Sequence, residues 1–348
     1  MSISISEIGT PRPVRPSRTR HLAPVLSFFE CQRLNGKCKR HSGDVLVSLY
    51  FLRSGFGPAS VSFTTVRYST ISFLSDFGHQ DEFVGVVHSV IKSIAPEVGI
   101  VDLTHGIAPH DVRAGALALA RSAQYVCPGV VLAVIDPGVG TERKAVAVEV
   151  GDGASVLVGP DNGLLASAVA MVGGASRAVS LTNADYQLPK LGSTFDGRDV
   201  FAPVAAHLAM GVDLTELGPT LDPSALTPGL LPIIDTEDGG LVVEVLWIDR
   251  YGNVQLNVGP EDLAPWGDPV SITVHGRTET IAMRPAYRTL ATGEVGAIID
   301  SSGLVSLALN GSSAAEHLGL KASDELRIDK IDGPEGTSTP VTLSRDPR

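Results

Sequence analysis

The sequence predicts an α/β N-terminal domain with a mainly parallel central sheet, followed by a smaller all-β domain. From about Ser69, short β-branched runs alternate with Ala-rich stretches of helical period, and these runs are apolar nearly throughout. Strands of that kind are buried on both faces, which indicates a parallel sheet covered by helices. Beyond Thr236 the runs are punctuated by Gly and Pro, with hardly any helical period. That pattern is typical of a β-sandwich or a small barrel.

The elements of the first domain follow from this alternation in chain order. The expected strands cover residues 71–75, 98–103, 130–136, 145–150 and 155–159, and the expected helices cover 82–95, 111–126, 163–172 and 199–211. A Pro-rich connection over 218–232 interrupts the pattern after the last helix. We therefore expect the α/β domain to cover 69–232.

The second domain is expected over 236–330 and consists of strands. Their runs cover 240–249, 252–258, 269–276, 278–284, 296–301, 303–310 and 324–329. The remaining residues, 331–348, have the composition of a flexible tail. With 348 residues and 43% hydrophobic content, the chain has enough apolar material for two cores.

The first 40 residues differ from the rest of the chain in charge. They carry eight Lys/Arg against two acidic residues, although the whole chain has a formal net charge of −11. Rich in Ser, Pro and Arg and without a sustained period, residues 1–68 are expected to form a basic, disordered extension. An organelle-targeting leader, a misassigned start and a flexible tail are the alternative explanations for its basic part.

Cysteine content and charge indicate a compartment and exclude two kinds of partner. The chain holds three cysteines, Cys31, Cys38 and Cys127, a sparse and odd set that predicts a reducing, cytoplasmic compartment. Cys31 and Cys38 with His41 match no common zinc spacing, so no metal is expected there. The acidic body excludes a broad nucleic-acid surface. The sequence contains no uncharged apolar run of about 18 residues, so no membrane-spanning helix is predicted.

Acidic residues follow the expected strands at the edge where open α/β sheets bind ligands. Asp76 comes directly after the first strand, and Asp81 lies just before the first helix. An acid at a strand end can accept both hydroxyls of a ribose. The plainer interpretation makes Asp76 a turn residue and Asp81 a helix N-cap. Asp111 is likewise expected to cap the second helix, while His110 beside it lines a pocket or covers the helix start.

The segment IDPGVGTERK, residues 135–144, places two glycines between an acid and a basic cluster. It is not a phosphate-binding P-loop, because no Lys-Ser/Thr pair ends it, and a dinucleotide loop would lead into a helix rather than a strand. We expect it to present Asp136 and Arg143 at a strand end, with the glycines allowing a close turn. The alternative is a surface ion pair that contributes very little.

A second dense cluster, STFDGRD, covers residues 193–199. Asp199 is the expected N-cap of the fourth helix. Asp196 and Arg198 are not needed for the cap and are therefore available for a functional role. So many acids on loops predict a ligand that carries hydroxyls and positive charge.

Seven motifs in matching order resemble one family, the S-adenosylmethionine (SAM) hydrolases, also called SAM hydroxide adenosyltransferases. These enzymes are relatives of the SAM-dependent fluorinase and chlorinase. The motifs are SDFG…DEF, LTHGIAPHDVRAGA, VIDPGVGTER, VGPDNGLL, TFDGRDVFAPVAAHLA, IDRYGN and SSGLVSLALN, and they lie between about Ser69 and Asp329. The resemblance implies an N-terminal α/β domain and a C-terminal β-barrel-like domain. It also implies a homotrimer whose active sites form between the N-domain of one subunit and the C-domain of the next.

The resemblance further implies the reaction of SAM with water to give adenosine and L-methionine, without a cofactor or a metal. Asp76 would bind the ribose diol, and His110 would lie near the nucleoside. Asp81 and Asp249 would face the methionine ammonium, and Ser301 would face its carboxylate. The adenine edge would be read by Asn253 and by the backbone around Leu309, Asn310 and Gly311.

Asp136 and Arg143 match the acid and the arginine of the family's catalytic set. The sulfonium departs as a neutral thioether and needs no general acid, so the reaction requires a water held in line behind C5′. An arginine favours hydroxide there, and a carboxylate orients the water or takes its proton. The halogenases lack this pair, and its presence therefore favours hydrolysis.

The chain departs from the family pattern at two positions. Asp196 stands where the hydrolases usually have a His, and its charge would offset the field of Arg143, so we expect activity that is retained but slowed. Ser302 replaces an aromatic or Arg-type residue that follows the carboxylate-binding Ser301. The alternatives are a SAM-dependent, chlorinase-like halogenase and a catalytically impaired protein that binds SAM or adenosine.

Overall fold

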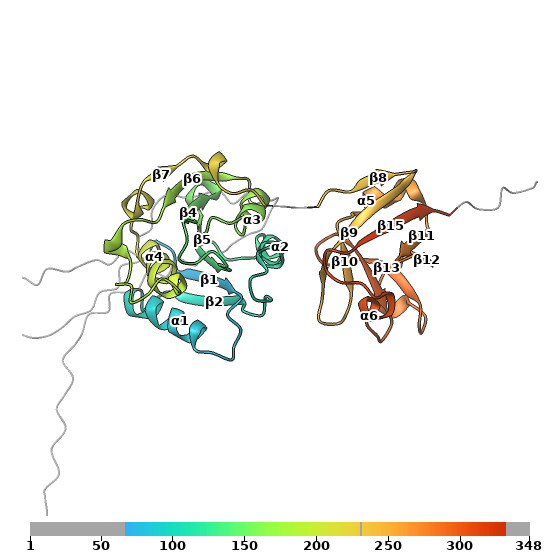
Figure 1. Cartoon of the computed structure of the whole chain (residues 1–348), viewed down its shortest axis with the longest axis horizontal. Helices are drawn as coiled ribbons and strands as arrows, with labels where there is room; N and C mark the ends of the chain where they lie inside the picture. Colours follow the sequence, from blue (N-terminus) through green and yellow to red (C-terminus); the bar gives the residue numbers. More distant parts are fainter. Residues whose placement is uncertain (1–66, 230–231, 332–348) are drawn as a thin grey trace, which may run out of the picture. The chain divides into compact units, whose positions relative to one another are not determined.

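The structure, a computed structural model, describes residues 67–229 and 232–331. It contains one seven-stranded and one eight-stranded sheet (Figure 1), and the hydrophobic clusters that pack on the first sheet are separate from that of the second. The expected classes of the two domains, α/β and all-β, are confirmed. Residues 1–66 and 332–348 lie outside the described residues, and so does the Cys31, Cys38 and His41 cluster. No helix in the described ranges is long and apolar enough to cross a membrane.

The first sheet has the strand order β2-β1-β3-β5-β4-β6-β7. Its strands are β1 (Thr70–Ser75), β2 (Gly99–Thr104), β3 (Val130–Val134), β4 (Ala145–Val150), β5 (Ser155–Pro160), β6 (Ala175–Ser180) and β7 (Thr220–Leu221). The neighbours from β2 to β5 pair in parallel, while β4 runs against both β5 and β6. A short hairpin joins β4 to β5, and a connection that short permits only antiparallel pairing. The mainly parallel sheet is thus confirmed, and β6 and β7 are additions that the sequence pattern did not predict.

Helices cover both faces of this sheet. They are α1 (Phe83–Ile94), α2 (Val112–Ser122), α3 (Ala166–Met171) and α4 (Ala202–Ala209), with short turns of helix at Gly151–Gly153, Ala184–Tyr186, Leu214–Leu217 and Pro223–Ala225 and a π-helix at Gly197–Phe201. Phe73 of β1 packs in one core with α1 and α4, whereas its neighbour Leu74 packs in another with α2 and α3. Because successive strand residues point to opposite faces, both faces must be apolar, as the sequence pattern indicated.

The strand order places a crevice between β1 and β3. The chain leaves β1 toward β2 on one side and then crosses to β3 on the other side. In open α/β sheets ligands bind at such a switch point, outside the carboxyl ends of the strands. Asp76 follows the last residue of β1 directly, and Asp136 lies two residues beyond β3. The fold therefore brings both acids to the edge of the sheet where a ligand is expected.

The second sheet is antiparallel and nearly closed into a barrel, in the order β12-β11-β15-β9-β10-β14-β13 with β8 beside β9. Its strands are β8 (Asp235–Glu237), β9 (Gly240–Ile248), β10 (Val254–Leu256), β11 (Val270–Val274), β12 (Arg277–Ile281), β13 (Val295–Ile299), β14 (Val305–Leu309) and β15 (Glu325–Lys330). Short helices lie at α5 (Pro260–Leu263), α6 (Ala314–Leu318), Ala264–Trp266 and Tyr287–Thr289. After β12 the backbone returns to β13, where Arg284 N donates to Ala297 O at 2.8 Å and Ala297 N donates to Ala282 O at 3.0 Å. This pairing joins the two ends of the strand order.

The helix starts agree with the sequence only in part. Asp111 caps α2 as expected, because its carboxylate accepts from Ala114 N at 2.8 Å. Asp81 is not an N-cap: the helical backbone begins one residue later, at Glu82, whose side chain makes no capping bond. Asp199 is not one either, because it lies inside the π-helix and its buried carboxylate accepts from Arg198 Nε at 2.7 Å. Arg198 is therefore an ion-pair partner of Asp199 and is not available for the functional role expected from the sequence.

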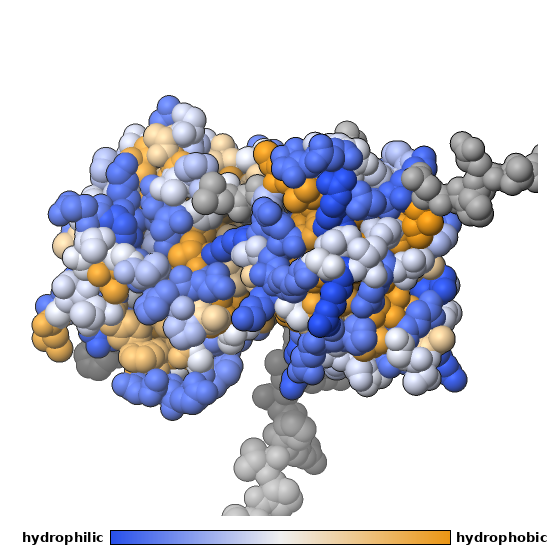
Figure 2. All heavy atoms as spheres, turned by 45° about the vertical axis from the view of Figure 1, so that its right-hand side comes forward, coloured by the Kyte–Doolittle hydropathy of each residue, from blue (hydrophilic) through white to orange (hydrophobic). Residues whose placement is uncertain are grey.

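The exposed surface carries no single large apolar area in the view of Figure 2, where apolar residues are separated by polar ones. The most exposed large apolar side chains are scattered along the chain, at Tyr125, Leu191, Ile233 and Tyr251. Scattered apolar residues of this kind are normal on soluble proteins and mark no site by themselves. The cavities and their polar groups are therefore the features that indicate a site.

Candidate functional site

A cavity of about 250 Å³ lies at the carboxyl ends of β1 and β3. It brings together four residues singled out in the sequence, and a group of phenylalanines completes its wall. The lining includes Asp76, His110, Asp136, Asp196, Phe77, Phe83 and Phe195. Charged and aromatic side chains thus meet in one concave space, which is typical of a ligand site.

Asp76 and His110 are joined through the backbone of the histidine. His110 N donates to one carboxylate oxygen of Asp76, Oδ2, at 2.8 Å. The backbone of His110 is left-handed, with φ of 69°. Such a conformation costs a residue with a Cβ atom about 1–2 kcal/mol, so the bond to Asp76 and the capped start of α2 hold it in place. The bond keeps the half-buried Asp76 carboxylate oriented at the cavity.

Asp136 and Arg143 form a two-pronged ion pair across the 135–144 segment. Arg143 Nε donates to the two Asp136 carboxylate oxygens at 2.8 and 2.9 Å, and Arg143 Nη2 also contacts Oδ2. Only 7% of the Asp136 side chain and 12% of the Arg143 side chain are exposed. Paired oxygens and a guanidinium fork give directional, charge-assisted bonds. The alternative of a weak surface pair is therefore wrong, because the pair is buried.

The glycines of this segment are needed for its path. Gly140 has φ of 78°, and a Cβ atom there would lie 2.7 Å from the backbone oxygen of Ser193. The 135–144 segment therefore lies directly against the loop that carries Asp196. On the other side, Asn162 Nδ2 donates to Ile135 O at 2.9 Å and braces the end of β3 beside Asp136.

Asp196 extends the ion pair into a network of four charges. Arg143 Nη2 donates to Asp196 Oδ2 at 2.7 Å, and Lys190 Nζ donates to Asp196 Oδ1 at 2.7 Å. The Asp196 side chain is 8% exposed and that of Lys190 is 41% exposed. Two carboxylates therefore face two cations. The sequence predicted that the charge of Asp196 would offset the positive field of Arg143. In the structure, Lys190 balances the charge of Asp196 from its other oxygen.

Arg143 stays protonated in this setting. Burial alone would lower the pKa of Arg143, but hydrogen bonds and charges from Asp136 and then Asp196 outweigh it and raise the pKa. The guanidinium also lies over the Phe201 ring, 5.2 Å from its centroid. Its Nη1 makes no hydrogen bond to any described residue, whereas Nε and Nη2 are both engaged. One donor arm of a fixed cation is thus available to a ligand or a water.

Sequence reasoning missed Lys190 and the aromatic wall of the cavity. Phe77, Phe83 and Phe195 pack on one another with ring centroids 5.1 to 5.8 Å apart. Each lies in a motif already quoted, SDFG…DEF or TFDG, so their attachment to the site acids was the available signal. Lys190 had no such signal, because it lies six residues before Asp196 in an irregular segment.

A second set of expected residues gathers in the barrel domain, around a cavity of about 640 Å³. The lining includes Asp249, Asn253, Leu309, Asn310 and Gly311, together with Tyr251, Tyr287, Ser312 and Ser313. Burial, and then the charges of Asp249 and Asp300, raises the pKa of Tyr287. Its hydroxyl therefore remains a hydrogen-bond donor at neutral pH.

Asp249 holds the loop that carries Asn253. Its Oδ1 accepts from Tyr251 N at 2.8 Å and from Asn253 N at 2.9 Å, and its Oδ2 accepts from Asn253 Nδ2 at 2.7 Å. Gly252 has φ of 81°, and a Cβ atom there would lie 2.1 Å from Ser313 Oγ. The turn is thus fixed by a carboxylate inside it and by close packing on Ser313.

Two expected site residues lie in neither set. Asp81 and Ser301 are exposed, and neither lines the two cavities described above. The turn that carries Ser301 is held by Asp300, which accepts from Ser302 N at 2.8 Å and from Gln255 Nε2 at 2.6 Å. The roles expected for Asp81 and Ser301 at the methionine end remain predictions.

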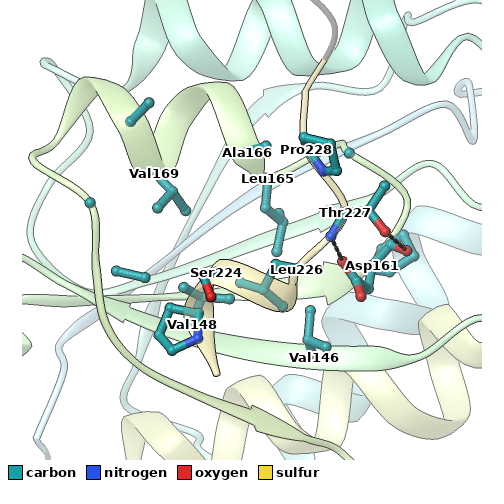
Figure 3. Close-up of a pocket in the computed structure, with 16 residues that line it drawn as sticks. Val146, Val148, Asp161, Leu165, Ala166, Val169, Ser224, Leu226, Thr227 and Pro228 are labelled. Carbon is teal, nitrogen blue, oxygen red and sulfur yellow. Dashed lines mark hydrogen bonds between the residues drawn. The ribbon is translucent and has the colours of Figure 1, made fainter. Parts of the chain in front are cut away.

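Another cavity, of about 380 Å³, lies near α3 and β4 and is shown in Figure 3. Its lining is mainly aliphatic, with Val146, Val148, Leu165 and Leu226 around it. Its acid, Asp161, is engaged, since Oδ1 accepts from Thr227 N at 2.8 Å. The residues that line it include none of the expected site residues, so this cavity is not the candidate site.

Neither site cavity collects a set of metal ligands from the described residues. Among the described residues, one group of three His, Cys or acidic side chains could share an ion, and it consists of His88, Asp102 and His105. None of these three residues lines the cavities at Asp136 or Asn253. The arrangement at Asp136 and Arg143 instead suits electrostatic and acid-base chemistry on a small nucleophile.

Comparisons with known proteins agree with this division into two sets. Residues 71–218 match the model of the SAM hydroxide adenosyltransferase N-terminal domain, and residues 243–327 match that of the C-terminal domain. A protein of Salinispora tropica named (R)-S-adenosyl-L-methionine hydrolase is 44% identical over 258 residues, or 74% of this chain and 97% of the relative. A fluorinase of Actinoplanes sp. is 27% identical, over 75% of this chain and 97% of the relative. The crystal structure of an uncharacterized conserved protein from Thermotoga maritima superposes with a TM-score of 0.68 at 33% identity, over 74% of this chain and 99% of that one.

Proposed function

The chain belongs to the SAM hydroxide adenosyltransferase family, and we propose that it hydrolyses SAM to adenosine and L-methionine. The observation that carries the proposal is the buried pair of Asp136 and Arg143 at the sheet crevice, with one guanidinium nitrogen that makes no hydrogen bond to any described residue. Since relatives at 44 and 43% identity are named (R)-S-adenosyl-L-methionine hydrolase, we take the (R) sulfonium epimer as the substrate.

Substrate binding is assigned to both sets of residues. Asp76, oriented by His110, accepts the ribose hydroxyls, and the phenylalanine wall packs on the sugar and the sulfonium region. Aromatic faces attract a cation through the quadrupole of the ring. Asn253 and the backbone from Leu309 to Gly311 read the adenine edge. Asp81, Asp249 and Ser301 hold the methionine end, as the family resemblance implies.

The attacking water is held by Arg143 Nη1 and by a carboxylate oxygen of Asp136 or Asp196. As the water loses a proton, the fixed cation stabilises the developing hydroxide, which is the principal electrostatic contribution expected here. Arg143 cannot be the base, because its raised pKa keeps it protonated. A carboxylate therefore takes the proton.

The step balances without a further reactant. The water oxygen forms a bond to C5′ as the bond from C5′ to the sulfonium sulfur breaks, and that electron pair stays on the sulfur as a neutral thioether. The proton taken by the carboxylate passes to solvent. No metal ion, cofactor or general acid takes part in the step as we propose it.

Lys190 lets the chain use an aspartate where a histidine is usual in the family. Asp196 adds a negative charge beside Arg143, and Lys190, 2.7 Å away, balances it. We therefore propose that the enzyme is active and that Asp196 orients Arg143. The halogenase alternative is less favoured, because a halide needs no carboxylate-arginine pair.

The product profile tests the reaction. The full chain is incubated with SAM in halide-free buffer made with heavy-oxygen water, beside the Arg143→Ala and Asp196→His variants. Chromatography and mass spectrometry should find methionine and adenosine with the label at the 5′ hydroxyl. Conversion that requires chloride would support the halogenase instead, and binding without conversion would support the impaired binding protein.

We propose further that the two sets of residues complete one site in a homotrimer, with the N-domain of one subunit and the C-domain of the next. The support for this is that ribose and water chemistry gathers in one domain and adenine recognition in the other. We place the enzyme in the cytoplasm, since its few cysteines suit a reducing compartment.

Co-expression of two inactive variants tests the shared site. Arg143→Ala removes the water site, and Asn253→Ala removes adenine recognition. If neighbouring subunits share sites, random mixing in a closed trimer restores about one quarter of the wild-type sites. If each chain completes its own site, no activity returns. Light scattering on the wild-type protein should give the mass of three chains.

A further inference from the structure

A group of ligating side chains outside both cavities is not used by the proposed reaction. His88 lies on α1, Asp102 on β2, and His105 directly after β2. Asp102 Oδ1 lies 2.9 Å from His88 Nε2 and 3.1 Å from His105 Nε2, and the three ligand atoms lie within 4.8 Å of one another. Elements that follow one another along the chain thus place two imidazoles and one carboxylate together.

His105 has a nitrogen aimed into this group without a hydrogen-bond partner. The residue is 1% exposed, and its Nδ1 lies 2.7 Å from Ser75 Oγ. Its buried Nε2 makes no well-formed hydrogen bond to any described residue, although Asp102 Oδ1 lies 3.1 Å away as an ion-pair partner. The Phe73 ring packs on the imidazole with centroids 4.6 Å apart and fixes its orientation. A buried nitrogen held in this way needs a partner.

We propose that His88, Asp102 and His105 bind one Zn²⁺ ion in each chain. Two imidazoles and one carboxylate, with a position left for water, form a donor set that zinc accepts in proteins. Bonds of 2.0–2.1 Å in a tetrahedral site place donor atoms about 3.3 Å apart. The observed separations of 2.9 and 3.1 Å differ from this by a few tenths of an ångström, which small side-chain rotations supply.

The ion has a structural role at the turn that carries Asp76. His105 O accepts from Gly78 N at 2.8 Å, and Ser75 Oγ, bonded to His105 Nδ1, accepts from Phe77 N at 3.3 Å. A metal on Nε2 leaves the proton on Nδ1, where it donates to Ser75. The ion would thus fix the histidine that supports both ends of the Asp76 turn. This inference does not depend on the proposed hydrolysis.

Metal titration of the full chain tests the site. Protein freed of metal with a chelator is titrated with Zn²⁺ by calorimetry and with Co²⁺ by visible absorption. Both should give one ion per chain, and the Co²⁺ spectrum should have the intensity typical of tetrahedral coordination. His88→Gln and Asp102→Asn change half-exposed side chains, and each should weaken Zn²⁺ binding more than about tenfold. Loss of a residue that only hydrogen-bonds a metal ligand already lowers metal affinity by about tenfold or more.

Two matched variants serve as controls. His317→Gln changes an exposed histidine paired with Glu279 in the barrel domain, and Cys31→Ser/Cys38→Ser/His41→Gln removes the other set of possible ligands. Both should bind Zn²⁺ as the wild type does. The proposal is wrong if the wild type binds no ion, or if the cluster variants bind as tightly as the wild type. X-ray absorption of the Zn²⁺ complex, which should report nitrogen and oxygen donors without sulfur, decides the matter even if a variant fails to fold.

Discussion

The two site cavities hold their polar groups in opposite ways. In the α/β domain, buried side chains of Asp136, Arg143 and Asp196 bind one another directly. In the barrel domain, Asp249 binds the backbone and amide of its own loop, and the neighbouring Tyr251 is largely exposed. Charges fixed in a dry environment act strongly on a developing charge, whereas a braced loop offers shape and hydrogen bonds. Under the proposed function, we therefore expect the chemistry in the first cavity and the recognition of SAM in the second.

Removal of the Arg143 guanidinium should change turnover more than any other substitution in the two cavities. Arg143→Ala is expected to lower kcat about 10²–10³-fold, as loss of one transition-state donor does, with little change in SAM affinity. Asp76→Ala is the matched variant in the same cavity and should mainly weaken binding. Rapid-quench turnover and calorimetry separate the two effects. A collapse of affinity with unchanged turnover of bound SAM in Arg143→Ala would contradict the water-holding role.

A change in the barrel loop should act on affinity instead. Asp249→Asn places an amide where Asn253 Nδ2 and two backbone N–H groups donate, so at least one bond is lost. We expect KM to rise about tenfold with a smaller change in kcat, since one such bond corresponds to about 1.4 kcal/mol. Steady-state kinetics measures both. An equal fall in kcat and kcat/KM would assign chemistry to this loop and remove the contrast.

The balancing cation should have a smaller effect, because it is partly exposed. Lys190→Met leaves the second carboxylate beside Arg143 without its partner and should lower kcat less than about tenfold. Lys190→Arg should restore the rate. The decisive comparison is a double-variant cycle with Asp196→His, in which loss of Lys190 should matter little because the extra carboxylate is gone. Equal effects of Lys190→Met in both backgrounds would mean that the lysine acts elsewhere.

Acid should destabilise the α/β domain slightly through His207 on α4. Burial lowers the pKa of His207, so near pH 6 the unfolded chain binds more protons than the folded one. Stability from this group is therefore full above the unfolded-state pKa of about 6.5 and is lost as the pH falls from there through the lower pKa of the folded state. Denaturant midpoints at several pH values, compared with His207→Gln, measure the loss. A variant with the same acid slope as the wild type would exclude this histidine.

The sequence predicted the strands and the site acids where local pattern decides them. Continuous apolar runs identified β1 and β3, and the acids after them meet because parallel strands end at one edge. Asp111 was predicted as a cap because α2 begins with a sharp change of period. Asp81 was not a cap, because a second acid, Glu82, stands at the helix start and either one satisfied the pattern.

The remainder depended on contacts between segments without any period. Lys190 reaches Asp196 only because an irregular loop folds back, and no spacing rule describes that loop. The helical segment begins with a π-helix at Gly197, two residues before the expected start, so Asp199 lies inside it and pairs with Arg198 instead of capping it. Short strand β7 holds two residues and has too little pattern to be predicted.

The pairing of Ala282–Arg284 with β13 determines how other chains can attach to the barrel domain. It occupies backbone groups of Ala282, Arg284 and Ala297, so a further strand cannot pair at that point of the seam. The first sheet, in contrast, ends at β2, whose outer edge pairs with no other described strand and whose Val101 is 45% exposed. Strand addition is one of the simplest routes to assembly and to aggregation, so the β2 edge, unpaired among the described strands, is more open to it than the barrel at residues 282–284.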